Sequence, residues 1–286
     1  MAPKITPRRS EDRGHTDLGW LDARYTFSFD AYRDHNFAGF GALQVLNEDI
    51  IKPGKGFGKV SMITKNLRFS PTCSLANSDI RTVSNPSASY FLFALSLLIL
   101  LSFLPPSTLA MGNTETLRRG DIQLTTSGPG ITHSETNASS KKNCKLLQIW
   151  TQPSGDGTRL PVTYHTKRFP DALKLNRLLR VIAPAGEADP ETEMALHADV
   201  SVYACLLEPG MRVGVVAGKL EGGRARRAYV HATMGGNGEL LMQGQEGEVV
   251  LGGGDGAFVT GWRAGEEMGF EARGEKRIEF LVFDLA

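Results

Sequence analysis

The sequence predicts an all-β protein of barrel or sandwich type, long enough for two domains. Three observations carry this prediction. Glycine is frequent, at 32 of 286 residues. Short apolar runs are separated by Gly, Pro and Asn, which is the pattern of strands joined by turns. From residue 197 onward such runs follow one another at even spacing, as they do in barrels and sandwiches.

The elements before residue 59 fit this pattern. Residues 18–32 are rich in aromatics and alternate loosely, which indicates the entry into a strand. Residues 36–41 predict a glycine turn, residues 42–47 a short apolar strand, and residues 53–58 a second glycine-rich turn.

Residues 59–110 have a different texture. They contain no histidine, and no charged residue occurs between Arg81 and Glu115. Residues 90–104 form an apolar run that, with the two residues before it, approaches the ~20 residues of a membrane span. We expect this segment not to continue the strands of its flanks, and to form coil plus a helix near 88–104.

The β texture returns after residue 111. The expected strands lie at 122–126, 131–135 and 146–152, and the turns between them at 118–121 and 127–130. Residues 153–196 contain several prolines and indicate a connector with irregular pieces. Residues 197–286 predict a complete set of short strands.

The run GPGITHSETN at 128–137 is the strongest chemical signal. Residues two apart on a strand share a face, so the His133 imidazole and the Glu135 carboxylate are expected to point the same way. An imidazole with a carboxylate suits Fe, Mn or Ni better than structural zinc. Two ligands do not make a site, and at least one other strand must supply the rest.

Together with other segments, this motif resembles the pirin family of two-barrel cupins. The supporting segments are RGH at 13–15, GWL at 19–21, TFSF at 26–29, GFG at 39–41, VLNED at 45–49, PGKGFG at 53–58, MGN at 111–113, GDIQ at 120–123, HSE at 133–135 with Asn137, LQIW at 147–150, YACLLEPG at 203–210 and LVFDL at 281–285. The resemblance covers residues 8–58 and 111–286.

The resemblance implies two cupin-type β-barrels, the first of them interrupted by a non-homologous, partly apolar segment. The expected parts are the beginning of the N-terminal cupin at 1–58, the aberrant segment at 59–110, the second part of the N-terminal cupin at 111–152, the connector at 153–196 and the C-terminal cupin at 197–286.

The resemblance also implies a metal centre. In pirins a His-Pro-His segment follows the Gly-Phe-Gly turn, and its two histidines join the His and Glu of HSE around iron. By resemblance His133 and Glu135 are metal ligands, and Glu135 is also placed to act as a catalytic base. Here KVSM at 59–62 follows the Gly-Phe-Gly turn at 56–58, so two ligands are absent. We expect weak binding of Fe(II) or none, because affinity rises with ligand number and preorganisation.

The other histidines considered are expected outside this site. His15 and His35 lie in turns, and His165 lies in the connector. His231 has no acidic or histidine partner two residues away, so the C-terminal barrel is expected to be metal-free, as in pirins. A swing of His35 or His165 into the site is the alternative. Asp121 follows a glycine and is expected in a turn.

Three functions stay open. The resemblance implies an iron-dependent, quercetinase-like dioxygenase whose metal would bring a flavonol-like small molecule and O2 together. It also allows a non-enzymatic nuclear co-regulator that binds transcription factors, as described for animal pirins. The third is a protein anchored in a membrane by residues 90–104. Topology opposes this third function, because the flanks of that stretch belong to one barrel and must lie on one side of any membrane.

Composition bears on nucleic-acid binding and on the cellular location. A net charge of +1 gives no electrostatic case for direct nucleic-acid binding. Cys73, Cys144 and Cys205 are too scattered for a disulfide framework, and the N-terminus lacks an apolar signal region. We therefore expect a cytoplasmic or nuclear location, or both.

Residues 59–61 can be encoded by AAG-GTA-AGT, which contains the usual start of a eukaryotic intron. One hypothesis is that 59–110 is translated intron or misframed exon instead of a real insertion.

Overall fold

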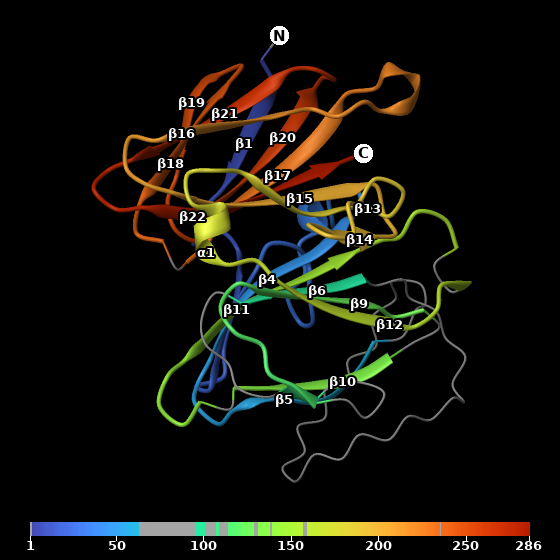
Figure 1. Cartoon of the computed structure of the whole chain (residues 1–286). Coiled ribbons are helices and arrows are strands. Elements are labelled where there is room, and N and C mark those ends of the chain that lie inside the picture. The colour runs from blue at the N-terminus through green and yellow to red at the C-terminus, as the bar shows by residue number, and fades with distance from the viewer. Residues whose placement is uncertain are drawn as a thin grey trace. The chain divides into compact units, whose positions relative to one another are not determined.

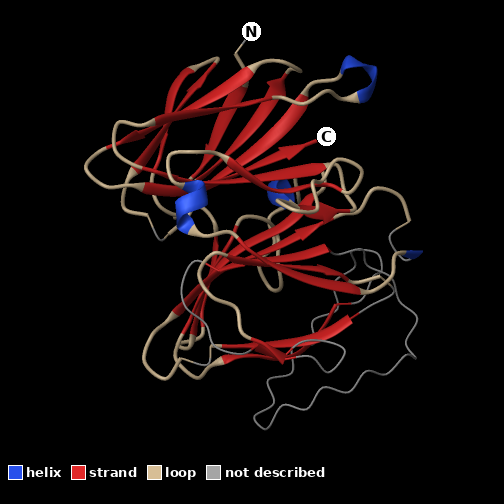
Figure 2. Ribbon diagram, in the orientation of Figure 1, coloured by secondary structure: helices blue, strands red, loops and turns tan. Residues whose placement is uncertain are grey.

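The structure is a computed structural model. It describes residues 2–62, 95–100, 107–108, 114–128, 131–137, 139–156, 159–234 and 236–286. These residues are mostly strands joined by short loops, as Figure 2 shows. The chain divides into two compact units, and each takes segments from separate parts of the sequence. The N-terminal unit comprises Gly14–Gly39 and Leu43–Arg168, and the C-terminal unit comprises Met1–Arg13, Phe40–Ala42 and Phe169–Ala286.

The C-terminal unit is built from two antiparallel-dominated sheets. Its elements are β1 (Lys4–Arg8), α1 (Asp171–Lys174), β13 (Leu179–Pro184), β14 (Met194–Leu196), β15 (Val200–Leu207), β16 (Arg212–Val216), β17 (Arg226–Ala232), β18 (Glu239–Gly244), β19 (Gly247–Leu251), β20 (Gly256–Trp262), β21 (Glu267–Arg273) and β22 (Ile278–Leu285). The strand order is β1-β20-β17-β22-β15-β13-β14 in one sheet and β16-β21-β18-β19 in the other. The β prediction for 197–286 is confirmed.

The core of this unit draws inward-facing side chains from both sheets. Trp262 of β20, Phe270 of β21 and Phe280 of β22 are fully buried in one hydrophobic cluster. Phe270 and Phe280 have ring centroids 5.1 Å apart. Alternation along each strand therefore sends one set of residues into the space between the sheets, as expected for a barrel or sandwich.

The N-terminal unit contains the motif found in the sequence. Its strands are β2 (Gly14–Asp17), β3 (Leu21–Tyr25), β4 (Leu43–Ile51), β5 (Gly56–Met62), β6 (Leu95–Leu100), β7 (Ser107–Thr108), β8 (Thr114–Glu115), β9 (Asp121–Thr126), β10 (Ile131–Thr136), β11 (Cys144–Thr151) and β12 (Thr163–Arg168). The main sheet has the order β12-β9-β6-β11-β4-β3-β2, and the described parts of β10 and β5 pair with each other, as do β7 and β8. Figure 1 shows the β10–β5 pair as a separate layer of this unit.

The expected helix near 88–104 is wrong where the structure describes it. Residues 95–100 form β6, which pairs antiparallel with β9 on one side and with β11 on the other. A six-residue apolar run has no periodicity that separates a buried helix from a strand with neighbours on both sides. The expected coil and the remaining parts of the expected helix fall at 63–94, 101–106 and 109–113, which lie outside the described residues.

The expectation that 59–110 does not continue the strands of its flanks is also wrong for the parts described. Strand β5 runs through Met62 and stays paired with β10, and β6 completes the row between β9 and β11. Residues 153–196, expected as a connector, hold β12, β13 and β14. Among the residues that the structure describes, no helix is long and apolar enough to cross a membrane.

Candidate ligand and metal site in the N-terminal unit

His133 and Glu135 lie side by side on β10. His133 is 7% exposed and Glu135 is 6% exposed. The His133 Nε2 and Glu135 Oε1 atoms are 3.7 Å apart, although the register against β5 shifts between these two residues. The strand therefore presents an imidazole and a carboxylate together, in agreement with the spacing in the sequence.

The two side chains belong to the inner face of the unit. Phe57 of β5 is the Cα partner of Glu135, and directly opposite residues of an antiparallel pair share a face. Phe57 packs against a buried cluster that includes Tyr25 of β3 and Leu146 of β11, and its ring lies 5.5 Å from Trp20. The β10–β5 layer thus faces the main sheet with the side that carries Glu135.

Burial dominates the electrostatics of Glu135. It raises the pKa of the carboxyl above its ordinary value, and the neighbouring His133 lowers the pKa in part. Glu135 Oε2 is buried and has no hydrogen-bond partner among the described residues. An unpaired carboxylate oxygen in such a place is costly unless a ligand, an ion or water reaches it.

A hydrogen-bonded cluster on β8, β9 and β12 lies near this carboxylate. Tyr164 donates to Glu115 Oε2 at 2.6 Å, Thr166 donates to the same oxygen at 2.7 Å, and Gln123 Nε2 donates to the Tyr164 hydroxyl. Burial and the hydrogen bond to Glu115 raise the pKa of Tyr164, and the charge of Glu135 adds to this effect. Nothing in the sequence assigned these residues to the site, because only strand pairing brings them together.

A second polar group lies on β4 and β11 of the main sheet. Asn47 is the Cα partner of Gln148, and Trp150 follows two residues later on β11, so the three share a face. Asn47 is also the partner of Tyr25, whose side chain is in the buried cluster. Neither Asn47 Oδ1 nor Asn47 Nδ2 has a partner among the residues that the structure describes, and the same holds for Trp150 Nε1.

The residues present do not fit a complete metal centre. Within the described ranges, no group of three or more His, Cys, Asp or Glu side chains could hold a metal ion. His133 and Glu135 supply two donors, which leaves most of a coordination sphere to water. Across the strand pair, Val60 is the Cα partner of His133 and Met62 is the partner of Ile131. The β5 position in register with His133 thus carries valine, which cannot bind a metal ion.

The other histidines lie elsewhere. His15 Nε2 is 2.9 Å from Asp22 Oδ1 in an exposed pair. His35 is exposed in a 3-10 turn at His35–Phe37, and His165 is exposed on β12. His231 is buried in the C-terminal unit. Neither His35 nor His165 stands in for a missing ligand in this structure.

The contacts of Asp121 and His231 belong to a turn and to core packing. Asp121 accepts a hydrogen bond from the backbone N–H of Arg118 at 2.6 Å, which fits the expected turn role. The His231 ring stacks on Tyr229 at 6.4 Å between centroids, inside the C-terminal unit.

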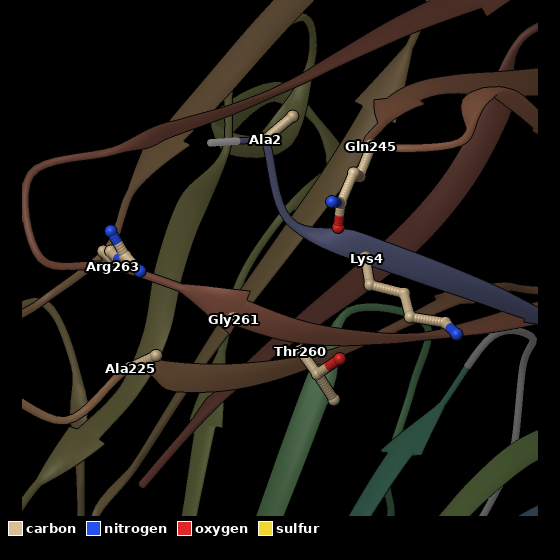
Figure 3. Close-up of a pocket in the computed structure, with 7 residues that line it drawn as sticks. All are labelled: Ala2, Lys4, Ala225, Gln245, Thr260, Gly261 and Arg263. Carbon is tan, nitrogen blue, oxygen red and sulfur yellow. The ribbon is translucent and has the colours of Figure 1, made fainter.

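A pocket of about 250 Å³ lies at the edge of the C-terminal unit. It is lined by Ala2, Lys4, Ala225, Gln245, Thr260, Gly261 and Arg263. Figure 3 shows the side chains of Lys4 and Arg263 extending away from each other. Lys4 Nζ also lies 3.6 Å from Glu246 Oε1. The two cations do not converge on an anion, so this pocket is a weaker candidate than the N-terminal unit.

Comparison with known proteins decides the family. A sequence model described as Pirin matches residues 110–151. The putative quercetin 2,3-dioxygenase PA1210 of Pseudomonas aeruginosa is 31% identical over 226 residues, which are 78% of this chain and 80% of that protein. This chain belongs to the pirin family. The quercetin 2,3-dioxygenase of Escherichia coli strain K12 is 28% identical over 283 residues, 97% of both chains.

Solved structures confirm the architecture. The crystal structure of the bacterial pirin YhhW from Escherichia coli, in complex with nickel(II), matches with a TM-score of 0.73 at 26% identity, over 98% of both chains. A second structure of YhhW also has a TM-score of 0.73, and it covers 99% of this chain and 97% of its own. The prediction of a two-cupin pirin fold is therefore confirmed, and nickel(II) binding is a property of that relative.

Proposed function

We propose that this pirin binds a flavonol-type ligand inside its N-terminal unit, as a quercetin 2,3-dioxygenase-like protein with an incomplete metal centre. The observation that carries the proposal is the buried pair of His133 and Glu135, with Glu135 Oε2 left without a partner among the described residues. Relatives that cover nearly the whole chain are named quercetin 2,3-dioxygenase, which supports the ligand class.

The residues present divide the work as follows. Glu135 Oε2 accepts a hydrogen bond from a ligand hydroxyl, and a carboxyl whose pKa burial has raised is a better proton acceptor than an ordinary one. His133 Nε2 lies 3.7 Å from the other carboxylate oxygen, and His133 limits how far the pKa of Glu135 rises. The hydrogen bonds of Tyr164 with Glu115 and Gln123 hold β8, β9 and β12 together beside the ligand. Quercetin turnover by the unmodified chain is slow or absent, because two donors hold a divalent ion poorly.

Restoring two histidines tests this proposal. A histidine placed at position 60 is expected beside His133, because the two positions are register partners, and position 62 lies two residues further along the same strand face. The double variant V60H/M62H should retain stoichiometric iron or nickel after gel filtration and should consume quercetin in air. Adding His133→Ala should abolish both properties.

The chain offers a matched control. K59H/S61H adds the same two residues to the same strand at the alternate positions, and Ser61 is the register partner of Thr132. This variant should gain no metal beyond the unmodified chain. Stoichiometric iron in the unmodified chain, lost on His133→Ala, would contradict the proposed incomplete centre.

A further inference from the structure

We infer that Asn47 forms hydrogen bonds directly to the ligand of the N-terminal unit, and that Trp150 and Glu135 contact the same ligand. The inference rests on the proposed function and adds to it the residues of the main sheet that select the ligand.

The hydrogen-bonding state of Asn47 is the first step. Its side chain is 1% exposed, yet both amide atoms lack a partner among the described residues. Burying a polar group without a compensating hydrogen bond destabilises the folded state. Two unpaired atoms on one buried side chain call for an explanation other than packing.

Asn137 shows what a buried structural asparagine looks like in the same unit. It is fully buried, donates to the backbone oxygens of Ile51 at 2.8 Å and Lys142 at 2.9 Å, and accepts from the Ser139 N–H at 3.0 Å. Its amide tethers the loop after β10 to β4, and both its nitrogen and its oxygen form hydrogen bonds. Asn47 does none of this, although it is buried to the same degree.

The position of Asn47 is the second step. It points to the face that carries Tyr25 and Leu146 of the buried cluster, and the β10–β5 layer presents Phe57 to that same cluster. Asn47 and Glu135 therefore face one interior from opposite layers. On the Asn47 side, Trp150 presents its unpartnered indole N–H and packs edge-on against Phe29, with ring centroids 5.5 Å apart.

The pattern of open donors and acceptors names the ligand class. Asn47 Oδ1 and Glu135 Oε2 accept hydrogen bonds, whereas Asn47 Nδ2 and Trp150 Nε1 donate them. A matching ligand carries hydroxyl donors and oxygen acceptors on the same frame. The aromatic side chains of Phe29, Trp150 and Phe57 favour a flat aromatic frame. A polyhydroxylated aromatic with a keto oxygen, such as a flavonol, meets both requirements.

The experiment compares two substitutions of the same type. Asn47→Leu and Asn137→Leu are made in the full chain, with Asn47→Ala as a second variant at the first position. Thermal unfolding and quercetin affinity are measured with metal removed by chelation, and unsubstituted flavone serves as the ligand without hydroxyls. We expect Asn47→Leu to keep or raise the Tm and to weaken quercetin binding at least tenfold. It should weaken flavone binding less, because flavone keeps the keto oxygen but has no hydroxyl donor. Asn137→Leu should lower the Tm, because it leaves the loop and strand groups unpaired.

The outcomes separate this inference from the proposed function. Equal quercetin affinity in the unmodified chain and both Asn47 variants overturns the role of Asn47 and leaves the proposed function standing. A fall in Tm for Asn47→Leu as large as that for Asn137→Leu also overturns it, because it shows a structural role. Failure of V60H/M62H to oxidise quercetin refutes the dioxygenase-like function, while a tenfold loss of binding in Asn47→Leu still supports the inference. An unmodified chain that does not bind quercetin overturns both.

Discussion

The ion pairs of Arg226 give the clearest prediction about stability. This arginine on β17 is 5% exposed and donates from Nε to Asp284 on β22, and from Nη2 to Asp199 Oδ1 at 2.8 Å. Its two partners differ in their surroundings. The Asp284 side chain is 5% exposed and that of Asp199 is 42% exposed. The same guanidinium therefore tests a buried pair and a solvent-screened pair.

The expected magnitudes follow from these exposures. Arg226→Met leaves the Asp284 carboxylate buried without its cation, and such a loss costs about 3–5 kcal/mol of unfolding free energy. Asp199→Ala removes only a half-exposed partner and should cost about 0–1 kcal/mol. The double variant Arg226→Met/Asp284→Leu should recover most of the loss, because no unpaired charge stays behind.

The loss should also depend on pH. Burial raises the pKa of Asp284, and Arg226 lowers it in part. Without Arg226 the folded-state pKa rises further above the unfolded one. The unfolded chain then releases the proton first as pH increases, so the destabilisation by Arg226→Met grows from acidic to neutral pH and shrinks again in acid.

Urea unfolding followed by Trp262 fluorescence measures these changes, with Trp20 and Trp150 replaced by Phe so that only the C-terminal unit reports. Equal losses for Arg226→Met and Asp199→Ala would refute the argument from burial. A loss at pH 4 as large as that at pH 7 would refute the argument from the carboxylate charge.

Three further predictions concern single residues. A Cβ at Gly56 would lie 2.1 Å from a backbone oxygen of β10, so Gly56→Ala should separate β5 from β10 and cost about 1–3 kcal/mol in thermal unfolding, whereas Gly186→Ala, with nothing within 4 Å, should be neutral. Burial raises the pKa of Cys205 to about 12, so stability should fall between pH 9 and 12 as the unfolded thiol ionises first, and Cys205→Ala should remove that slope in alkaline denaturation curves. Tyr164, held by Glu115, should stay protonated in an alkaline ultraviolet titration until the chain unfolds.

The sequence predicted the parts of this protein that depend on local pattern. Gly-punctuated apolar runs gave the strands of residues 197–286, and the two-residue spacing of His133 and Glu135 gave their shared face. It failed at 95–100, where an apolar run without periodicity became the strand between β9 and β11. Pairing on both sides decided that outcome, and pairing is not a local property.

The same reason hid the rest of the candidate site. Asn47, Gln123 and Tyr164 are polar residues of three separate strands, and nothing in the sequence assigns them to a common site, although Asn47 and Gln123 lie in segments that carry the family resemblance. Their roles come from register, which fixes the face on which each side chain lies and the residue opposite to it. In the sequence, the combination of a buried position and an unpaired amide at Asn47 is invisible.

The pairing of β1 with β20 imposes an order of events on synthesis. Lys4 is the register partner of Thr260, so 256 further residues must be made after Lys4 before its partner exists. At roughly 5–20 residues per second, that wait lasts about 13–50 s. During this time the backbone of Lys4–Arg8 offers an unpaired strand to any neighbouring chain, and Pro7 removes one of its donors. Synthesis of Gly256–Trp262 is therefore the earliest point at which β1 can pair and the sheet of the C-terminal unit can be completed on that side.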